Sequence, residues 1–517
     1  MSDAKFKLPL KEKIGYGLGD TAANLVWRGV LAFLMIFYTD VFGISAAAAG
    51  VLLLVVRLSD GVTDVMMGMI ADRTETRWGK FRPWILWSAP VLGLFMVLSF
   101  TTPNFGPTGK LIWAYATYLG LILAYTANNV PYSALMGVMT PDHEERASLS
   151  SFRFAGAFLG GIIMTGFLLD LVKYFGRGDQ QKGYMYSTII YAVLLVILMV
   201  ITFLTTKERV APQKIQKGHM KRDMIDLVKN MPFIILPLLT ISAFVYYRNV
   251  TTGVILVAVL AGAYYFINKL INRPREETSG TQKDLVDVMQ NKPWLILLCI
   301  GFLFNMFNSV KQGAIAYYFK HFANEPVLAG RYLLVLLIVS MVAAFLTGYL
   351  SKIFGKKRLF IGSMVLSGIF TGFIFYMGPD QITAVFVLGS ISEFFAAILP
   401  VLYFTMLGDG ADFSEWQNGR RATGLVYSAG TFVMKASGGF AGAVIGIVLA
   451  NYGYDGQDPA TISATIPGIK LLMSWIPTVF VFVAAGVFMF YPLTSEKMAE
   501  IEADLALRRE RADSGIA

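Results

Sequence analysis

The chain has 517 residues, of which 56% are hydrophobic and 15% are charged. Soluble domains carry about 25% charged residues, so the composition excludes one or two large soluble domains. The net charge of +10 comes from Lys and Arg in short segments between apolar runs. That distribution indicates membrane topology rather than a nucleic-acid partner. A single cysteine, Cys299, excludes a disulfide framework.

Apolar runs long enough to span a bilayer, about 20 residues each, follow one another along the chain. They are continuous rather than alternating, so we expect helices and not a β-barrel. The fold class expected is an all-α polytopic membrane protein with about 14 spans. The spans are expected at 14–43, 46–71, 83–102, 111–138, 149–173, 184–206, 231–247, 252–271, 293–320, 328–351, 357–378, 382–408, 421–450 and 467–492.

An internal repeat divides these spans into two halves. GMIADRTETRWGKFRP (68–83) recurs in outline as GYLSKIFGKKR (348–358), each after the second span of its half. Paired six-span halves fit the parallel repeats of major facilitator transporters. We therefore expect an N-terminal bundle (1–210), linkers with an inserted hairpin at 231–271 (211–292), a C-terminal bundle (293–495) and a cytoplasmic tail (496–517). A local repeat of 222–236 at 283–297 suggests that the hairpin arose by duplication.

The basic segments fall after every second span, which predicts that both termini are cytoplasmic. The start of the chain is polar and lysine-rich and has no small-residue cleavage site, so we expect no cleavable signal peptide. An integral protein of the inner (cytoplasmic) membrane is expected, embedded in the lipid bilayer as a monomer.

Two carboxylates, Asp60 and Asp64, stand in the second span. At i and i+4 they share one helix face, about 6 Å apart along the axis. Close carboxylates repel unless a cation lies between them or one is protonated, which suits Na⁺ or a proton. The alternative is purely structural pairing with Arg57. The offsets that match them in the second half hold Ser340 and Ala344, so the acid pair is not a general feature of the repeat.

The first span carries a polar and aromatic stripe made of Asp20, Asn24, Trp27 and Arg28. Such a stripe is costly to expose to lipid, so it favours a water-filled cavity with hydrogen bonds to substrate hydroxyls. A helix–helix contact, in which Asp20 pairs with a distant basic residue, is the alternative. Arg28 either neutralises Asp20 or binds an anionic substrate group with its planar fork.

Further polar residues lie inside later spans. Asn129 stands beside Asn128 near Pro131, in a segment that membrane helices tolerate where it lines a cavity. Arg153, Lys311, Glu393 and Lys435 add charges, and Lys435 is a candidate charge partner of the aspartates. By contrast, His143, His219 and His321 are scattered, and HExxH and P-loop motifs are absent. We therefore expect neither an enzyme nor an ATP-driven pump, and no metal or cofactor beyond a coupling Na⁺ or H⁺.

Several motifs together resemble the glycoside–pentoside–hexuronide:cation symporters, a subgroup of the major facilitator superfamily. They are IGYGLGDTAANLVW, IFYTDVFGIS, RLSDGVTDVMMG, RTETRWGKFRPWIL, YTANNVPYSAL, DHEERASLSSFRF, NKPWLILL, MLGDGADFSEWQNGRRATG and FVMKASGGF. The resemblance covers nearly the whole chain apart from the hairpin. It implies a secondary transporter that imports a glycoside or oligosaccharide by Na⁺ or H⁺ symport through alternating access.

The resemblance also implies residue roles. Asp60, Asp64 and Thr126 would bind the cation, and Asp20 would accept sugar hydroxyls with Arg153 beside it. Lys435, one turn after Thr431, would link the sugar and cation sites. The substrate-binding set is then Asp20, Asn24, Trp27, Arg28, Asn129, Arg153, Lys311, Thr431 and Lys435. Gating would fall to Asp72, Arg73, Arg77, Lys80, Asp409, Asp412, Glu415 and Arg420.

Three positions depart from the pattern of the family's melibiose-transporting members. Asn129 replaces an aspartate, Gly19 a lysine and Ser133 a tryptophan. An amide both donates and accepts hydrogen bonds, whereas a carboxylate only accepts. A pentoside, another oligosaccharide or an acidic sugar is therefore as well suited as melibiose. Two other functions remain open on sequence grounds: a 14-span proton-coupled exporter of other small molecules, and a sugar sensor that does not transport.

Overall fold

The computed structural model describes residues 7–140, 142–209, 262, 291–418 and 423–513. The chain forms two compact units. The first comprises Met1–Tyr246, Gln312–Leu337 and Gly442–Ile469, and the second comprises Tyr247–Lys311, Ile338–Ala441 and Lys470–Ala517. The expected hairpin at 231–271 and the local repeat at 222–236 lie outside the described residues, apart from residue 262.

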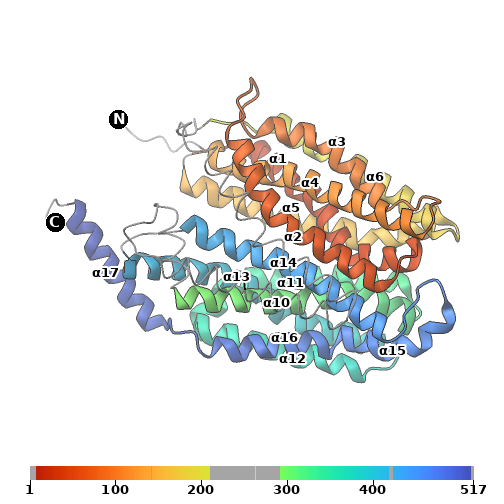
Figure 1. The fold of residues 1–517 in the computed structure, drawn as a ribbon. Coiled ribbons are helices and arrows are strands. Elements are labelled where there is room, and N and C mark those ends of the chain that lie inside the picture. The colour runs from red at the N-terminus through yellow and green to blue at the C-terminus, as the bar shows by residue number, and fades with distance from the viewer. Residues whose placement is uncertain (1–6, 141, 210–261, 263–290, 419–422, 514–517) are drawn as a thin grey trace. The chain divides into compact units, whose positions relative to one another are not determined.

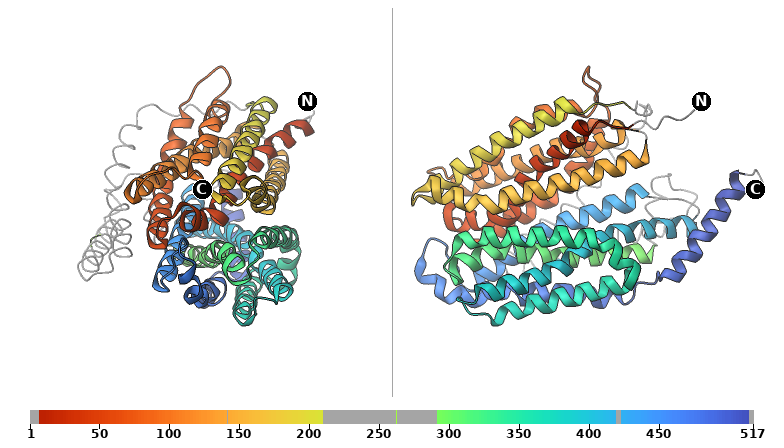
Figure 2. Two further views of the ribbon diagram at one scale, coloured as in Figure 1. Left: turned by 90° about the vertical axis from the view of Figure 1, so that its right-hand side faces the viewer. Right: turned by 180° about the vertical axis from the view of Figure 1, so that it is seen from behind.

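In the first unit, six long helices run alongside one another (Figures 1 and 2). α1 pairs with α5 and α6, α3 pairs with α4 and α6, α2 packs on α4, and α5 packs on α6. Each expected span in this half coincides with one of these helices. Their bounds are α1 Leu10–Gly29, continued by the π-helical turns η1 Val30–Leu34 and η2 Phe37–Phe42, α2 Ala46–Asp72, α3 Arg82–Ser99, α4 Pro107–Met139, α5 His143–Gly176 and α6 Gln180–Thr205.

The remaining helices follow in chain order and contribute mainly to the second unit. In that unit α12 packs on α13 and α16, and α17 packs on α13. Their bounds are α10 Lys292–Tyr317, continued by the π-helical turn η4 Tyr318–Phe322, α11 Pro326–Phe354, α12 Lys356–Phe373 with the 3₁₀ turn η5 Ile374–Tyr376, α13 Ile382–Asn418, α14 Thr423–Asn451, α15 Pro459–Met473, α16 Trp475–Phe488 and α17 Ser495–Asp513.

Two details at the C-terminal end differ from the sequence expectation. The last span is two helices, α15 and α16, because the Ser474 backbone leaves helical geometry (φ −133°, ψ −87°). Pro477 follows inside the first turn of α16, where its missing N–H costs no helical hydrogen bond. The tail also contains a helix, α17, whose buried Ile501 and Leu505 join the core of the second unit.

Among the described residues, nine helices are long and apolar enough to cross a bilayer. Together with the helical fold, they make the protein an integral membrane protein. Many of their apolar side chains remain exposed, for example Phe345 on α11 at 80%. That exposure is the expected outward face of a helix in lipid.

The second helices of the two halves, α2 and α11, correspond at a separation of 280 residues. α2 begins at Ala46 and α11 at Pro326, and each follows a π-helical turn. The same separation relates Asp40 to Lys320 and the repeat glycines Gly68 and Gly348 that the sequence singled out. Equivalent positions can therefore be compared residue by residue, as parallel transporter repeats require.

Glycines bring α1 and α5 into close backbone contact. A Cβ added at Gly156 would lie 2.0 Å from the Gly17 carbonyl oxygen, and one at Gly160 would lie 2.2 Å from the Thr21 carbonyl oxygen. Small residues at such crossings let membrane helices approach closely. The approach holds the start of α5, including Arg153, against the polar stripe of α1.

Candidate functional site

A hydroxyl of α4 joins the two carboxylates of α2. The Thr126 Oγ1 atom lies 2.9 Å from Asp60 Oδ1 and 3.1 Å from Asp64 Oδ1. Asp60 and Thr126 are buried, and Asp64 is half-buried. The i, i+4 spacing thus places both acids on the face of α2 that meets α4, as the sequence pattern predicted.

A threonine hydroxyl has one hydrogen, so it can donate to only one of the two carboxylates at a time. Its lone pairs remain available to a cation. Because each Oδ1 lies about 3 Å from the same Oγ1, the two carboxylate oxygens are no more than about 6 Å apart. Three oxygen ligands around one point form the kind of site that a hard cation, or a proton shared with one carboxylate, can occupy.

Arg57, the alternative partner of the aspartates, contacts aromatic residues of α1 and α4. Its Nε donates to the Tyr118 hydroxyl at 2.9 Å, and its guanidinium carbon lies 4.0 Å from the Trp27 ring centroid. Trp27 in turn stacks on Tyr125 with centroids 5.6 Å apart. The buried guanidinium therefore supports the aromatic part of the α1 stripe, one turn away from the acids.

Asp20 pairs with Arg153 across the α1–α5 contact. Arg153 Nε donates to Asp20 Oδ2 at 2.5 Å, and Arg153 Nη2 lies 3.4 Å from the Ser133 hydroxyl. The guanidinium also faces the ring of Tyr132 at 5.2 Å. A carboxylate that accepts and a guanidinium that donates, beside aromatic rings, can bind the hydroxyls and the apolar face of a sugar.

Two tyrosines pack beside the Asp20–Arg153 contact. Tyr16 and Tyr132 stack with centroids 4.9 Å apart, and each hydroxyl donates to the other residue's backbone carbonyl, at 3.3 Å and 2.6 Å. Both side chains are fully buried. Gly19 is needed here, because a Cβ would lie 2.3 Å from the Tyr132 ring. The departure from lysine at position 19 therefore has a packing reason in this chain.

The other predicted sugar ligands of the first unit are Asn24, Arg28 and Asn129. Asn24 donates its amide to the Asp20 backbone carbonyl at 3.0 Å rather than to the carboxylate. Arg28 and Asn129 are half-buried. Asn128 is the structural member of the asparagine pair, since its amide donates to Ser88 Oγ at 2.8 Å. Roles for Asn24, Arg28 and Asn129 remain predictions.

The second unit holds the remaining predicted sugar ligands. Lys311 pairs with Glu393, as its Nζ lies 2.9 Å from Glu393 Oε2. Thr431 and Lys435 lie on α14, where the Thr431 hydroxyl donates to the Tyr427 carbonyl at 3.0 Å and Lys435 is half-buried. The predicted function of these three residues stays a prediction.

The predicted gating residues lie at helix ends. Asp72 ends α2 and Arg73 follows it, while the Arg77 guanidinium lies 4.6 Å from the Trp78 ring centroid. The Lys80 N–H donates to Glu208 at 2.8 Å, next to the start of α3. In the second unit both Asp409 oxygens accept from Lys356 at 3.1 Å. Asp412 and Glu415 lie near the end of α13, and Arg420 lies outside the described residues.

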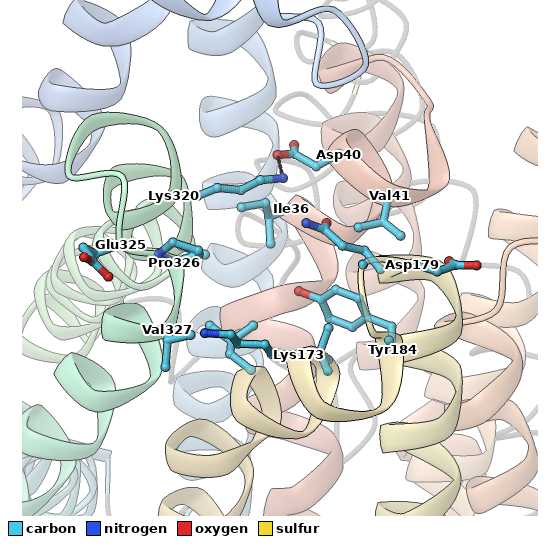
Figure 3. Close-up of a pocket in the computed structure, with 16 residues that line it drawn as sticks. Ile36, Asp40, Val41, Lys173, Asp179, Tyr184, Lys320, Glu325, Pro326 and Val327 are labelled. Atoms are coloured by element: carbon cyan, nitrogen blue, oxygen red, sulfur yellow. Dashed lines mark hydrogen bonds and ion pairs between the residues drawn. The ribbon is translucent and has the colours of Figure 1, made fainter.

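A buried charge cluster in the first unit was missed by sequence reasoning. Asp40 on η2 accepts from Lys320 at 2.5 Å and from the Tyr454 hydroxyl at 2.6 Å, and His321 Nε2 lies 2.9 Å from it. It borders a pocket of about 350 Å³ that extends to Lys173 and Tyr184 (Figure 3). The signal was available, because Asp40 and Lys320 are opposite charges at equivalent repeat positions.

This pocket does not include the Asp60–Asp64 pair. Its wall is mostly aliphatic, with Ile36, Val41 and Val327 among its lining residues. The oxygens of Asp60, Asp64 and Thr126 therefore form a candidate cation site that lies outside this pocket. Among the described residues, no group of three or more His, Cys, Asp or Glu side chains could hold a metal ion.

Comparison with solved structures establishes the fold. A bacterial homolog of the human lysosomal transporter Spinster superposes with a TM-score of 0.61 at 14% identity, covering 94% of this chain and 98% of that chain. A structure of a proton-dependent oligopeptide transporter gives a TM-score of 0.62 at 13% identity, covering 95% and 99%. At these identities the likeness shows a helical fold that the chain shares with membrane transporters.

Sequence comparison identifies the protein family. The family model described as "MFS/sugar transport protein" matches residues 15–250 and 242–495. The "Putative glycoside/cation symporter YagG" of Escherichia coli (strain K12) is 33% identical, covering 99% of this chain and 97% of that protein. The isoprimeverose transporter of Lactiplantibacillus pentosus is 30% identical, covering 98% and 95%. The chain belongs to this sugar-transport family of glycoside/cation symporters.

Proposed function

We propose that the protein imports a glycoside or oligosaccharide together with Na⁺ or H⁺ by alternating access, with both termini cytoplasmic. The observation that carries this proposal is the convergence of the Thr126 hydroxyl with the carboxylates of Asp60 and Asp64. Two carboxylates that share one hydroxyl offer a mobile cation several oxygen ligands at one place.

The repulsion between the two acids favours binding of a cation between them. Two ionised carboxylates about 6 Å apart repel by roughly 3 kcal/mol at an effective dielectric constant of about 20. Relief of that repulsion corresponds to about a 100-fold gain in cation affinity. The bound cation draws α2 and α4 together beside the aromatic stripe of α1. By linkage, the factor by which the bound cation raises substrate affinity is also the factor by which bound substrate raises cation affinity.

The substrate site is proposed around Asp20 and Arg153. Their 2.5 Å contact presents an acceptor and several donors at one place, with the Tyr132 ring beside them. Relatives include the isoprimeverose transporter. They also include a glucuronide carrier protein homolog of Escherichia coli (strain K12), which is 27% identical over 96% of this chain and 95% of that protein. Neutral glycosides and acidic sugars are therefore both candidates.

The test is uptake of labelled mono- and oligosaccharides, neutral and acidic, into vesicles with and without a Na⁺ gradient and with and without a pH gradient. We expect one gradient to drive accumulation of at least one glycoside. Asp64→Asn should abolish gradient-driven accumulation but leave exchange of internal for external substrate. Cation-driven accumulation that survives in Asp64→Asn would contradict the coupling site.

The same assay distinguishes neutral from acidic substrates. If Arg28 binds an anionic group, Arg28→Ala should weaken uptake of acidic sugars about tenfold more than uptake of neutral ones. An equal loss for both classes would instead favour a role of Arg28 in the charge balance of the α1 stripe.

A further inference from the structure

Three polar side chains meet inside the second unit. The Lys311 ammonium on α10 lies 2.9 Å from Glu393 Oε2 on α13, and the Ser340 hydroxyl on α11 donates to Glu393 Oε1 at 2.7 Å. The Lys311 Nζ also lies 4.8 Å from the Phe307 ring centroid. Lys311 is 2% exposed and Glu393 is half-buried, so this carboxylate is held by a positive charge and a hydroxyl within the helical bundle.

The composition of this cluster parallels the proposed cation site. With the 280-residue separation of the repeats, Ser340 on α11 is the equivalent of Asp60 on α2. In the first repeat the second helix supplies carboxylates and the fourth helix supplies the hydroxyl of Thr126. In the second repeat this arrangement is exchanged, since the second helix supplies the hydroxyl of Ser340 and the fourth helix supplies the carboxylate of Glu393.

We propose that Glu393 and Ser340 form a second cation-binding site whose resident cation is the ammonium group of Lys311. The ammonium is a compact, monovalent charge on a flexible stem, which makes it a closer substitute for a small cation than a planar guanidinium. Because it is covalently attached, it cannot exchange with solvent. Only the Asp60–Asp64 site then takes a cation from solution, which sets the coupling ratio at one cation per substrate.

Charge balance explains why the Glu393–Ser340 position in the second repeat needs a positive charge. A buried carboxylate without a positive partner is costly, and removal of one member of a buried pair destabilises strongly. Hard monovalent cations prefer oxygen ligands such as carboxylates and hydroxyls. Truncation of Lys311 to alanine leaves such oxygens around a space of ammonium size, so the vacated position should bind Na⁺ or Li⁺ directly. This assignment gives Lys311 an internal role in place of the substrate contact that the sequence suggested.

The inference rests on the proposed function, so its test is performed with the first site disabled. The full-length Asp60→Asn/Asp64→Asn protein is compared with the same protein carrying Lys311→Ala. Thermal unfolding is followed at constant pH and ionic strength as NaCl or LiCl replaces choline chloride. We expect the unfolding temperature of the Lys311→Ala protein to rise by about 3 °C at saturating Na⁺ or Li⁺. The protein that retains Lys311 should show no rise.

A third variant, which adds Glu393→Gln, should lose the rise. The proposal is overturned if the rise persists without the Glu393 carboxylate, or if neither ion raises the unfolding temperature. It is also overturned if only acidification stabilises the Lys311→Ala protein, since Lys311 and Glu393 would then be a structural ion pair. If Lys311→Ala does not fold, Lys311→Gln serves in its place, because the shorter amide leaves room for an ion.

These outcomes are independent of transport. A wild-type protein that shows no cation-driven uptake would refute the proposed function, whereas the unfolding measurements would still report on the Glu393 site. Conversely, in a coupled transporter, charge and substrate flux measured together should give a ratio of one in the wild type. With the first site intact, Lys311→Ala should raise that ratio to two or abolish transport. An unchanged ratio with intact transport would refute the inference.

Discussion

The close backbone contact between α1 and α5 at Gly156 predicts the effect of one methyl group. A Cβ at position 156 would lie 2.0 Å from the Gly17 carbonyl oxygen, whereas ordinary contacts begin near 3.4 Å. Gly156→Ala must therefore move α5 away from α1 by about 1.4 Å. Arg153, one turn earlier on α5, would move with the helix. Its 2.5 Å hydrogen bond to Asp20 would then exceed the length at which such a bond forms.

The loss should be measurable in substrate binding. A hydrogen bond between charged groups contributes roughly 1.5–3 kcal/mol, so we expect substrate affinity to fall about 10- to 100-fold. The assay is the half-saturating concentration for uptake of the best sugar in the panel. Gly137→Ala on α4 is the matched control, because a Cβ there meets nothing within 4 Å. Equal affinities in Gly156→Ala and Gly137→Ala would refute the link between helix approach and the Asp20–Arg153 geometry.

Three further predictions concern the first unit. Thr126→Val should lower cation affinity about tenfold by removing one oxygen ligand, whereas Thr126→Ser should not; cation titration of uptake checks this. The hydrogen bond from Lys13 holds the pKa of Glu145 below its usual range. The ionised Glu145 therefore stabilises the fold fully above about pH 5, and this stabilisation is lost as the pH falls through the lowered pKa. Glu145→Gln should therefore flatten the acid side of the unfolding temperature–pH curve. Lys320→Met should destabilise the protein by about 1–3 kcal/mol by removing the Asp40 partner, and adding Asp40→Asn should restore part of that loss; thermal unfolding measures both.

The positions of the helices could be predicted because apolar length alone specifies a spanning segment. The shared face of Asp60 and Asp64 was also predictable, since helical periodicity is local. The break at Ser474 was missed because the run from 467 to 492 was interpreted by its apolar length alone. Pro477 is a local signal for the break, since proline inside a helix loses a hydrogen bond and clashes with the carbonyl four residues earlier.

Pairing across long sequence separations was mostly beyond sequence reasoning. Lys311 and Glu393 are 82 residues apart, and no periodicity relates them. The contact of Asp20 with Arg153, 133 residues away, was expected only from the family resemblance. Periodicity identifies which residues face inward. The register between helices decides which of these residues contact one another, and it depends on side-chain volumes and on glycine contacts such as that of Gly156.

Among the described residues, the charged contacts inside the helical bundles are of two kinds. Asp20 with Arg153 and Lys311 with Glu393 each join opposite charges through a direct contact. Such pairs keep their charge balance without any ion from solution. The contact of Asp60 and Asp64 through Thr126 joins two like charges through a neutral group. In the proposed function a cation from solution binds at that point, and a cation that arrives from solution can also leave, which is what coupling requires. In the proposal for the second repeat, the Lys311 ammonium occupies the equivalent place without exchange.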